Sequence, residues 1–287
     1  MKSFFTAILL LSLLLCSFVS CNPKPTAIES ATFDSLTIDT IKPLFRSCTK
    51  PACHLYLRMD VPVSPTPETT AQAIERFVSL IPKEGAFEQS SDGTVQSMAH
   101  AYVRSYLMDY LRNGPEAIDN YGGDTLAAAN WMSYEESVEG RAIFNARGLL
   151  SYQIRTESYT GGAHGNTNID NAVLDMTTMS RVSLGDIFTD GTLREVNELM
   201  RQTLVREYGC QTLDELADKG LFFAPAEIEA TENFYVDGEG ITWNFDPYDI
   251  APYSMGEVQI SLPWSQLSSL VLLDSPVYKL VSGTTNN

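Results

Sequence analysis

Positive charge is scarce in this chain of 287 residues, with 19 Lys and Arg against 36 Asp and Glu and a formal net charge of −17. Nucleic-acid binding needs clustered basic side chains that neutralise phosphates, so we expect no nucleic-acid partner. An acidic surface keeps a protein soluble and attracts cationic partners. Solubility alone accounts for most of these acidic residues.

Histidine is also rare, and the three residues His54, His100 and His164 belong to no catalytic motif. The sequence has no G-x-S-x-G nucleophile elbow, no H-E-x-x-H spacing, no P-loop and no G-x-G-x-x-G fingerprint. Paired carboxylates for glycoside hydrolysis stay open, because an acidic chain offers such pairs by chance. We therefore predict no catalytic residue, no cofactor and no metal ion, and we leave the question of an enzyme open.

Long apolar runs are absent after the N-terminus, which reads MKSFFTAILLLSLLLCSFVSC. Its apolar run follows Lys2 and is too short to span a bilayer as a stable helix, which is typical of a secretory signal. The run ends in Ser20-Cys21, a small residue before a cysteine, and this ending resembles a bacterial lipobox. We predict a signal peptide over residues 1–20, acylation at Cys21 and a tether over residues 21–30. An ordinary signal peptide that contains Cys21 is the alternative.

Cleavage after Ser20 leaves 267 residues and removes one basic residue, so the mature chain has a formal charge of −18. That length fits one large domain or two closely packed smaller ones. The signal and the anchor predict an extracytoplasmic protein of the bacterial cell envelope. No acidic run follows Cys21, which favours an anchor that faces the periplasm.

Cysteine is scarce as well, and two of the five cysteines lie in or directly after the signal. In an oxidising compartment Cys48 and Cys53 can pair across CTKPAC, and we predict this disulfide beside the alternative of two free thiols. Cys210 is then left over as a buried thiol. A zinc site from Cys48, Cys53 and His54 is disfavoured, because no second Cys/His pair lies at finger-like spacing.

The patterning of the first half predicts strands followed by helices. Segments SLTIDTIKPLF and LYLRMDVPVS read as strands, since apolar residues alternate along the second. A helix is predicted with its N-cap at Thr66 and its end at Pro82. A second helix is predicted from Thr94 to Arg112, with Gly114-Pro115 as its end.

From Trp131 the pattern changes to short alternating strands with glycine-bearing breaks, which favours an antiparallel meander. A helix follows with a predicted capping box that begins at Thr192, and Asp237-Gly238 predicts a hairpin turn. We predict an α+β fold, an antiparallel sheet with packed helices, in two closely associated subdomains. Their predicted ranges are 31–130, a smaller α+β companion domain, and 131–287.

The stretch SYTGGAHGNTN, Ser158 to Asn168, places His164 between a glycine pair and a third glycine. It lies between two predicted strands, which suits a connection that needs positive φ at several positions. A turn in which His164 bonds a neighbouring carbonyl is the first interpretation. A ligand-contacting histidine is the second and a catalytic one the third. The later stretch FDPYDIAPYSMG predicts an ordered loop packed by Tyr248 and Tyr253.

The order of three blocks resembles a bacterial extracytoplasmic family of unknown function: SYTGGAHGNTN, VSLGDIF at Val182 to Phe188, and the run from Glu232 to Trp264. This family forms the carboxy-terminal part of the ectodomain of a lysozyme-sensing anti-sigma factor. It also precedes the catalytic domain of some peptidoglycan deacetylases. The resemblance spans about Leu149 to Leu273, and residues 31–130 resemble the smaller companion domain that commonly precedes the family.

The resemblance also implies fold-signature residues. Gly161 to His164 match the Gly-Gly-Ala-His block of the family, and a downstream block matches at Pro247, Tyr248, Ile250, Ala251, Pro252, Tyr253 and Gly256. The chain departs from both architectures, because it shows no sigma-binding segment, no transmembrane helix and no deacetylase domain. Sigma release and deacetylation are therefore not expected.

The leading hypothesis is a lipid-anchored envelope protein that binds a protein or cell-wall ligand, with a lysozyme-like cationic hydrolase or peptidoglycan as the partner. The alternatives are an enzyme that acts on envelope glycans through His164 and nearby carboxylates, and a structural envelope lipoprotein. The candidate ligand-binding residues are Tyr159, Gly161, Gly162, His164, Tyr248 and Tyr253.

Overall fold

The computed structural model describes residues 28–46, 49–81, 93–120, 122, 129 and 131–281. The predicted signal peptide, Cys21, most of the tether and Cys48 lie outside these residues. No helix in the described ranges has the length and apolarity that crossing a membrane requires.

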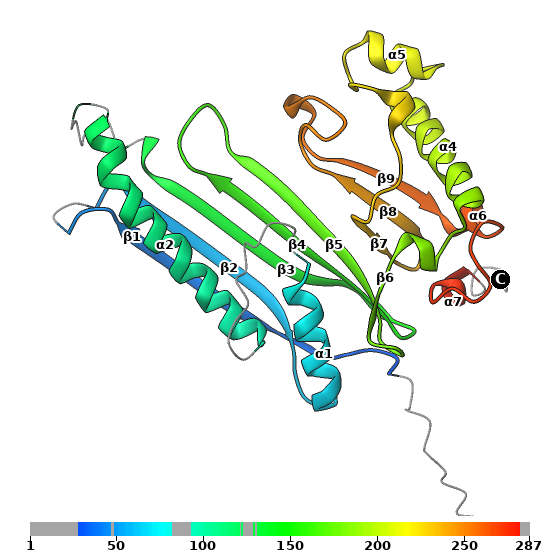
Figure 1. Ribbon diagram of the computed structural model, residues 1–287, viewed down its shortest axis with the longest axis horizontal. Coiled ribbons are helices and arrows are strands. Elements are labelled where there is room, and N and C mark those ends of the chain that lie inside the picture. The colour runs from blue at the N-terminus through cyan, green and yellow to red at the C-terminus, as the bar shows by residue number, and fades with distance from the viewer. Residues whose placement is uncertain are drawn as a thin grey trace, which may run out of the picture.

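A six-stranded sheet forms the larger part of the molecule, with its strands in the order β1-β2-β3-β4-β5-β6 (Figure 1). All neighbouring strands are antiparallel except β2 and β3, which pair in parallel. The bounds are β1 Phe33–Pro43, β2 Ala52–Pro62, β3 Tyr134–Ala146, β4 Leu149–Tyr159, β5 Asn166–Asp175 and β6 Ser180–Val182.

Two helices, α1 (Glu68–Ser79) and α2 (Val95–Asn120), cover one face of this sheet. Side chains alternate across a strand, so Leu55, Leu57 and Met59 of β2 point toward these helices and are buried there. The neighbouring residues His54, Tyr56 and Arg58 therefore lie on the opposite face of the sheet.

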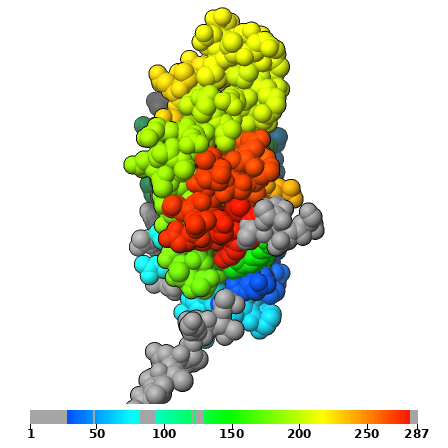
Figure 2. Space-filling view, turned by 90° about the vertical axis from the view of Figure 1, so that its right-hand side faces the viewer, coloured from blue at the N-terminus to red at the C-terminus, as the bar shows by residue number. Residues whose placement is uncertain are grey.

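The second sheet is smaller and antiparallel, with the order β7 (Phe234–Val236), β8 (Gly240–Phe245) and β9 (Val258–Pro263). It packs between the larger sheet and helix α4 (Asp190–Glu207), so the layers run helix, sheet, sheet, helix (Figure 1). Helix α4, α5 (Leu213–Asp218) and the C-terminal segment with α6 (Trp264–Leu267) and α7 (Tyr278–Val281) form the outer side seen in Figure 2. The predicted α+β class and antiparallel pairing are confirmed.

Asparagine side chains join the two sheets at the edge of β5. Because β6 pairs only with the last residues of β5, the N–H groups of Ile169 and Asn171 have no strand partner beyond β4. Asn233 Oδ1 accepts the Asn171 N–H at 2.8 Å, and Asp246 Oδ1 accepts the Ile169 N–H at 2.8 Å. Asn233 also donates to the carbonyl oxygens of Ile169 and Asn244.

Several sequence-based boundaries were wrong at the residue level. Helix α1 has Pro67 as its N-cap, since the Thr66 hydroxyl instead accepts the N–H of Thr32. The capping box of α4 begins at Thr189, with Thr192 as its N3 residue. The Asp237-Gly238 hairpin is confirmed, with the Asp237 N–H bonded to the carbonyl of Gly240.

Helix α2 continues through Gly114 and Pro115, where the sequence predicted an end. Packing explains the difference, because Leu44 lies against Gly114 so closely that an added Cβ would be 2.4 Å from it. Beyond the proline, Ile118 is buried in the same cluster as Leu44 and Tyr110, which holds the last turns in place. The larger sheet also contains strands from both predicted subdomains, because β2, before residue 130, pairs with β3, after it.

We expect Asn233→Ala to lower the free energy of unfolding by about 3 kcal/mol, because it leaves the buried Asn171 N–H without an acceptor and the Asn171 amide with Asn244 Oδ1 alone. Denaturant unfolding monitored by circular dichroism measures the change. The control is Asn168→Ala, which changes an exposed asparagine on β5, the strand that contains Asn171. It should change stability by less than about 0.5 kcal/mol. Equal losses in the two variants would contradict the assigned role.

Candidate functional site

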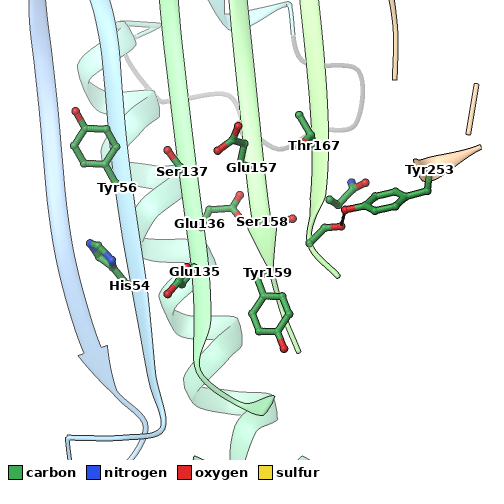
Figure 3. Close-up of a pocket in the computed structure, with 12 residues that line it drawn as sticks. His54, Tyr56, Glu135, Glu136, Ser137, Glu157, Ser158, Tyr159, Thr167 and Tyr253 are labelled. Atoms are coloured by element: carbon green, nitrogen blue, oxygen red, sulfur yellow. Dashed lines mark hydrogen bonds between the residues drawn. The ribbon is translucent and has the colours of Figure 1, made fainter. Parts of the chain in front are cut away.

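A groove of about 580 Å³ lies on the face of the larger sheet opposite α2, beside the small sheet (Figure 3). Strands β2, β3, β4 and β5 contribute its floor, and Tyr253 closes one side. Its lining consists of His54, Tyr56, Glu135, Glu136, Ser137, Glu157, Ser158, Tyr159, Gly165, Asn166, Thr167 and Tyr253.

The strand register arranges the groove side chains in two rows. His54 pairs with Glu135, and Glu135 pairs with Tyr159, which makes one row across three strands. The second row joins Tyr56 to Ser137, Ser137 to Glu157 and Glu157 to Thr167. Directly opposed side chains in a sheet contact one another, so each row is a continuous surface.

Two exposed carboxylates give the groove a negative charge. Glu135 lies opposite Tyr159, two residues from Glu157, so the two glutamates are diagonal neighbours with their Cα atoms roughly 7–8 Å apart. Arg155 offsets part of this charge, since it contacts Glu157 at 2.8 Å and Glu257 at 2.7 Å. Among the described residues, no Lys, Arg or His forms an ion pair with Glu135.

His54 stands at the β2 wall of the groove with its ring in contact with a carboxylate. Its Nε2 lies 2.8 Å from Asp39 Oδ1 on β1, and both side chains are largely exposed. The preceding residue, Cys53, is a buried free cysteine on the opposite face of the strand, and burial raises the pKa of its thiol to about 12. Cys53 and His54 therefore point apart and do not form the pair that a zinc site would need.

The predicted disulfide has one partner, Cys48, outside the described residues, so the pairing stays a prediction. Cys210 is buried and free, as its sequence position indicated. Within the described ranges, no three His, Cys, Asp or Glu side chains are grouped to hold a metal ion.

The glycine loop forms the rim of the groove and packs against the Tyr248–Tyr253 loop. His164 donates from Nδ1 to the carbonyl of Gly165 at 2.8 Å and stacks on Tyr253, with ring centroids 3.8 Å apart. Tyr253 Oη donates to the same Gly165 oxygen at 2.8 Å, the contact drawn in Figure 3. Tyr248 stacks in turn on Tyr253, so the two loops form one aromatic column.

Gly161 and Gly162 both have positive φ, at 85° and 111°, as the turn interpretation predicts. Their surroundings differ. An added Cβ at Gly161 would lie 2.2 Å from the main-chain oxygen of Trp131, whereas Gly162 has open space around it. Close approach to the segment before β3 therefore fixes the loop at Gly161.

Glu136 lies below the floor of the groove, on the α2 side of the sheet. It is buried and accepts a hydrogen bond from Tyr102 Oη of α2. Burial raises the pKa of Glu136 above its usual value, while the hydroxyl groups of Tyr102 and Tyr106 oppose that rise. One carboxylate oxygen of Glu136 is thus held by Tyr102 of the helix.

The sequence-predicted site residues are brought together only in part. Tyr159 and Tyr253 line the groove, whereas Gly161, Gly162, His164 and Tyr248 lie at or beside its rim. Sequence reasoning missed the strand residues of the floor, above all Glu135, Glu157 and Tyr56. Alternation marks them as facing away from the core, but only the register shows that they are neighbours.

A family model described as "Protein of unknown function (DUF3298)" matches residues 185–265. The chain contains a DUF3298 family domain. The matched range holds α4, α5 and the small sheet, including the block from Pro247 to Gly256. The glycine loop and the floor of the groove lie before the DUF3298 match.

Two solved structures resemble most of the chain. A DUF3298 family member from Bacteroides fragilis NCTC 9343 is 26% identical with a TM-score of 0.77, over 90% of this chain and 100% of that one. A DUF3298 family protein from Pseudomonas aeruginosa PAO1 is 15% identical with a TM-score of 0.56, over 85% of this chain and 95% of that one, and it shares the fold. No curated protein matches the chain.

We expect Gly161→Ala to lower the free energy of unfolding by about 3 kcal/mol, because the Cβ meets both a left-handed φ and the Trp131 carbonyl. Gly162→Ala is the matched control and should cost about 1 kcal/mol, since only its φ is unfavourable. Denaturant unfolding of both variants measures the difference. The reverse order of the two losses would show that contact with Trp131 does not fix the loop.

We expect Glu136→Gln to stabilise the protein at pH 7, because the amide can still accept from Tyr102 and has no charge to bury. A raised pKa means that the folded state binds the proton more tightly, so the wild-type free energy of unfolding should fall as pH rises from the usual glutamate pKa through the raised one.

In Glu136→Gln the decrease of the free energy of unfolding with rising pH should be smaller, because the titrating carboxyl group is gone. Unfolding curves between about pH 4 and pH 8 measure it. Glu135→Gln, the exposed neighbour on the other face, is the control. A lower stability of Glu136→Gln at pH 7 would contradict the argument.

Proposed function

We propose that this chain is a lipid-anchored cell-envelope protein whose groove binds a cationic protein, with a lysozyme-like hydrolase as the candidate partner. The exposed carboxylates Glu135 and Glu157 on neighbouring strands are the observation that supports it most directly. A Lys or Arg side chain placed between diagonal neighbours can contact both carboxylates. Association would be accelerated by the negative charge of the chain, −17 over the full sequence.

Tyrosine rings complement the carboxylates in this role. Tyr56, Tyr159 and Tyr253 stand on three sides of the groove (Figure 3). Aromatic faces attract guanidinium and ammonium groups, a role open to Tyr56 and Tyr159. Tyr253 already stacks on His164 and Tyr248, so it contributes contact area at its ring edge. The combination suits a basic side chain that enters from a folded partner.

Peptidoglycan is the second candidate, because tyrosine rings and carboxylates also suit sugar rings and their hydroxyl groups. Catalysis on glycans by His164 is less favoured, since that ring stacks on Tyr253 and bonds the adjacent carbonyl. Incubation with purified peptidoglycan separates binding from turnover. Released muropeptides would identify an enzyme, and co-sedimentation without release would identify a glycan-binding protein.

We expect the mature protein to bind animal-type lysozyme reversibly and to retain measurable affinity at about 0.15 M salt, where charges are screened beyond roughly 8 Å. Glu135→Gln with Glu157→Gln should weaken binding about tenfold, since buried interfacial charge pairs couple by more than about 1 kcal/mol. Calorimetric titration measures both affinities.

The control variant changes two exposed glutamates of α4 instead, Glu195→Gln with Glu207→Gln, and keeps the same net charge as the groove variant. Cytochrome c serves as an equally basic unrelated partner. Equal binding of lysozyme and cytochrome c, or equal weakening by the two double variants, would reduce the interaction to unselective charge attraction and reject the proposal.

A further inference from the structure

A second hollow, of about 480 Å³, lies between α1 and the end of β5 with the turn into β6. Its apolar wall consists of Phe77, Leu80, Leu174 and Met179, and its polar wall includes Arg76 and Arg181. The groove described above does not share any of these residues.

What sets these two arginines apart is that they line one hollow together, and neither forms an ion pair with another described residue. Within the part of the chain that the structure describes, Arg181 makes one long hydrogen bond, 3.5 Å, to the main-chain oxygen of Glu232. By contrast, Arg58, Arg141, Arg155 and Arg201 each contact a carboxylate. Arg76 and Arg181 thus leave guanidinium groups available, and guanidinium groups bind phosphate through paired hydrogen bonds.

The start of the described chain lies near the end of β5, the same end that contributes Leu174 to the hollow, since Gly148 bonds both Glu29 and Met176. Ile28 packs in the cluster that contains Met176 and Met179, and the carbonyl of Glu29 accepts the N–H of Gly148 at 2.9 Å. Cys21 is seven residues before Ile28 in the sequence, a separation that spans at most about 25 Å when fully extended. An acyl anchor at Cys21 would therefore keep this end of the molecule close to a membrane surface.

We propose that the hollow between α1 and the β5–β6 turn binds the phosphate head group of an anionic membrane phospholipid, through Arg76 and Arg181, while its apolar wall contacts the glycerol and upper acyl region. This inference rests on the lipid anchor of the proposed function. It also sets an orientation, because Asn166 in the groove and Leu174 in the hollow lie at opposite ends of β5, roughly 26 Å apart along the strand. The anchored protein would hold its groove away from the membrane.

The test holds the protein on vesicles by an artificial tether, a histidine tag before residue 22 bound to nickel-chelating lipid, in a Cys48→Ser background. An environment-sensitive fluorophore on Thr69→Cys, in the wall of the hollow, reports membrane contact. The same fluorophore on Ser137→Cys, in the groove, is the matched control.

We expect blue-shifted emission from the hollow on vesicles that contain phosphatidylglycerol, none on phosphatidylcholine alone, and none from the groove on either. Arg76→Gln with Arg181→Gln should lower the equilibrium constant for contact roughly 30-fold, at about fivefold for each basic residue near an anionic surface. Arg194→Gln with Arg206→Gln, on α4, should leave it unchanged.

Equal emission on the two vesicle types, or no effect of the Arg76 and Arg181 changes, would overturn the proposal. Calorimetric binding of inorganic phosphate to the untethered protein without any vesicle contact would also overturn it, since the hollow would then be a site for soluble phosphate and not for a lipid head group. The tether makes the assay independent of acylation and of lysozyme binding. Acylation is tested separately by fatty-acid labelling of the wild type and of Cys21→Ala.

Discussion

The unpaired edge of β5 is the constraint on which the arrangement of this molecule depends. A sheet edge that lacks a neighbouring strand exposes N–H and carbonyl groups that must find partners. Here β6 pairs with only three residues of β5, and side chains from the small sheet and its flanking loops provide the other contacts, through Asn233 and Asp246. The small sheet is therefore fixed in place by polar contacts as well as by the apolar cluster beneath it.

The groove is a consequence of that placement. The small sheet contacts β4 and β5, whereas the outer face of β2 and β3 remains open next to it. Where the small sheet meets this open face, Tyr253 donates a hydrogen bond to the carbonyl of Gly165. The close approach of Gly161 to Trp131 holds the glycine loop next to the first residues of β3. A loop that looks like a catalytic motif in the sequence thus requires glycine at Gly161 for its close contact with Trp131 and at Gly162 for its positive φ.

Local patterns predicted what depends on local physics. Alternation identified β2 and β4, helical spacing identified α1, α2 and α4, and Asp237-Gly238 identified the β7–β8 turn. The end predicted at Pro115 failed because packing of Ile118 outweighs the lost helical hydrogen bond. The parallel pairing of β2 with β3 was not predictable from pattern, since two helices and about 70 residues separate the strands.

The glutamates of the groove were not predicted from the sequence for the same reason, namely that strand pairing between distant segments has no local pattern. Glu135 and Glu157 become neighbours only through the β3–β4 register, and in a chain with 36 acidic residues neither is conspicuous by itself. Tyr159 and Tyr253 were identifiable because they flank glycine and proline blocks whose backbone requirements are visible in the sequence.

The DUF3298 match covers only one side of the groove. That match, residues 185–265, contains the small sheet and α4, but among the groove residues it contains only Tyr253. All other lining residues lie on β2 to β5 or in the glycine loop, outside the matched range. The family domain thus provides the cover that shapes one side of the groove, and the larger sheet provides its charge.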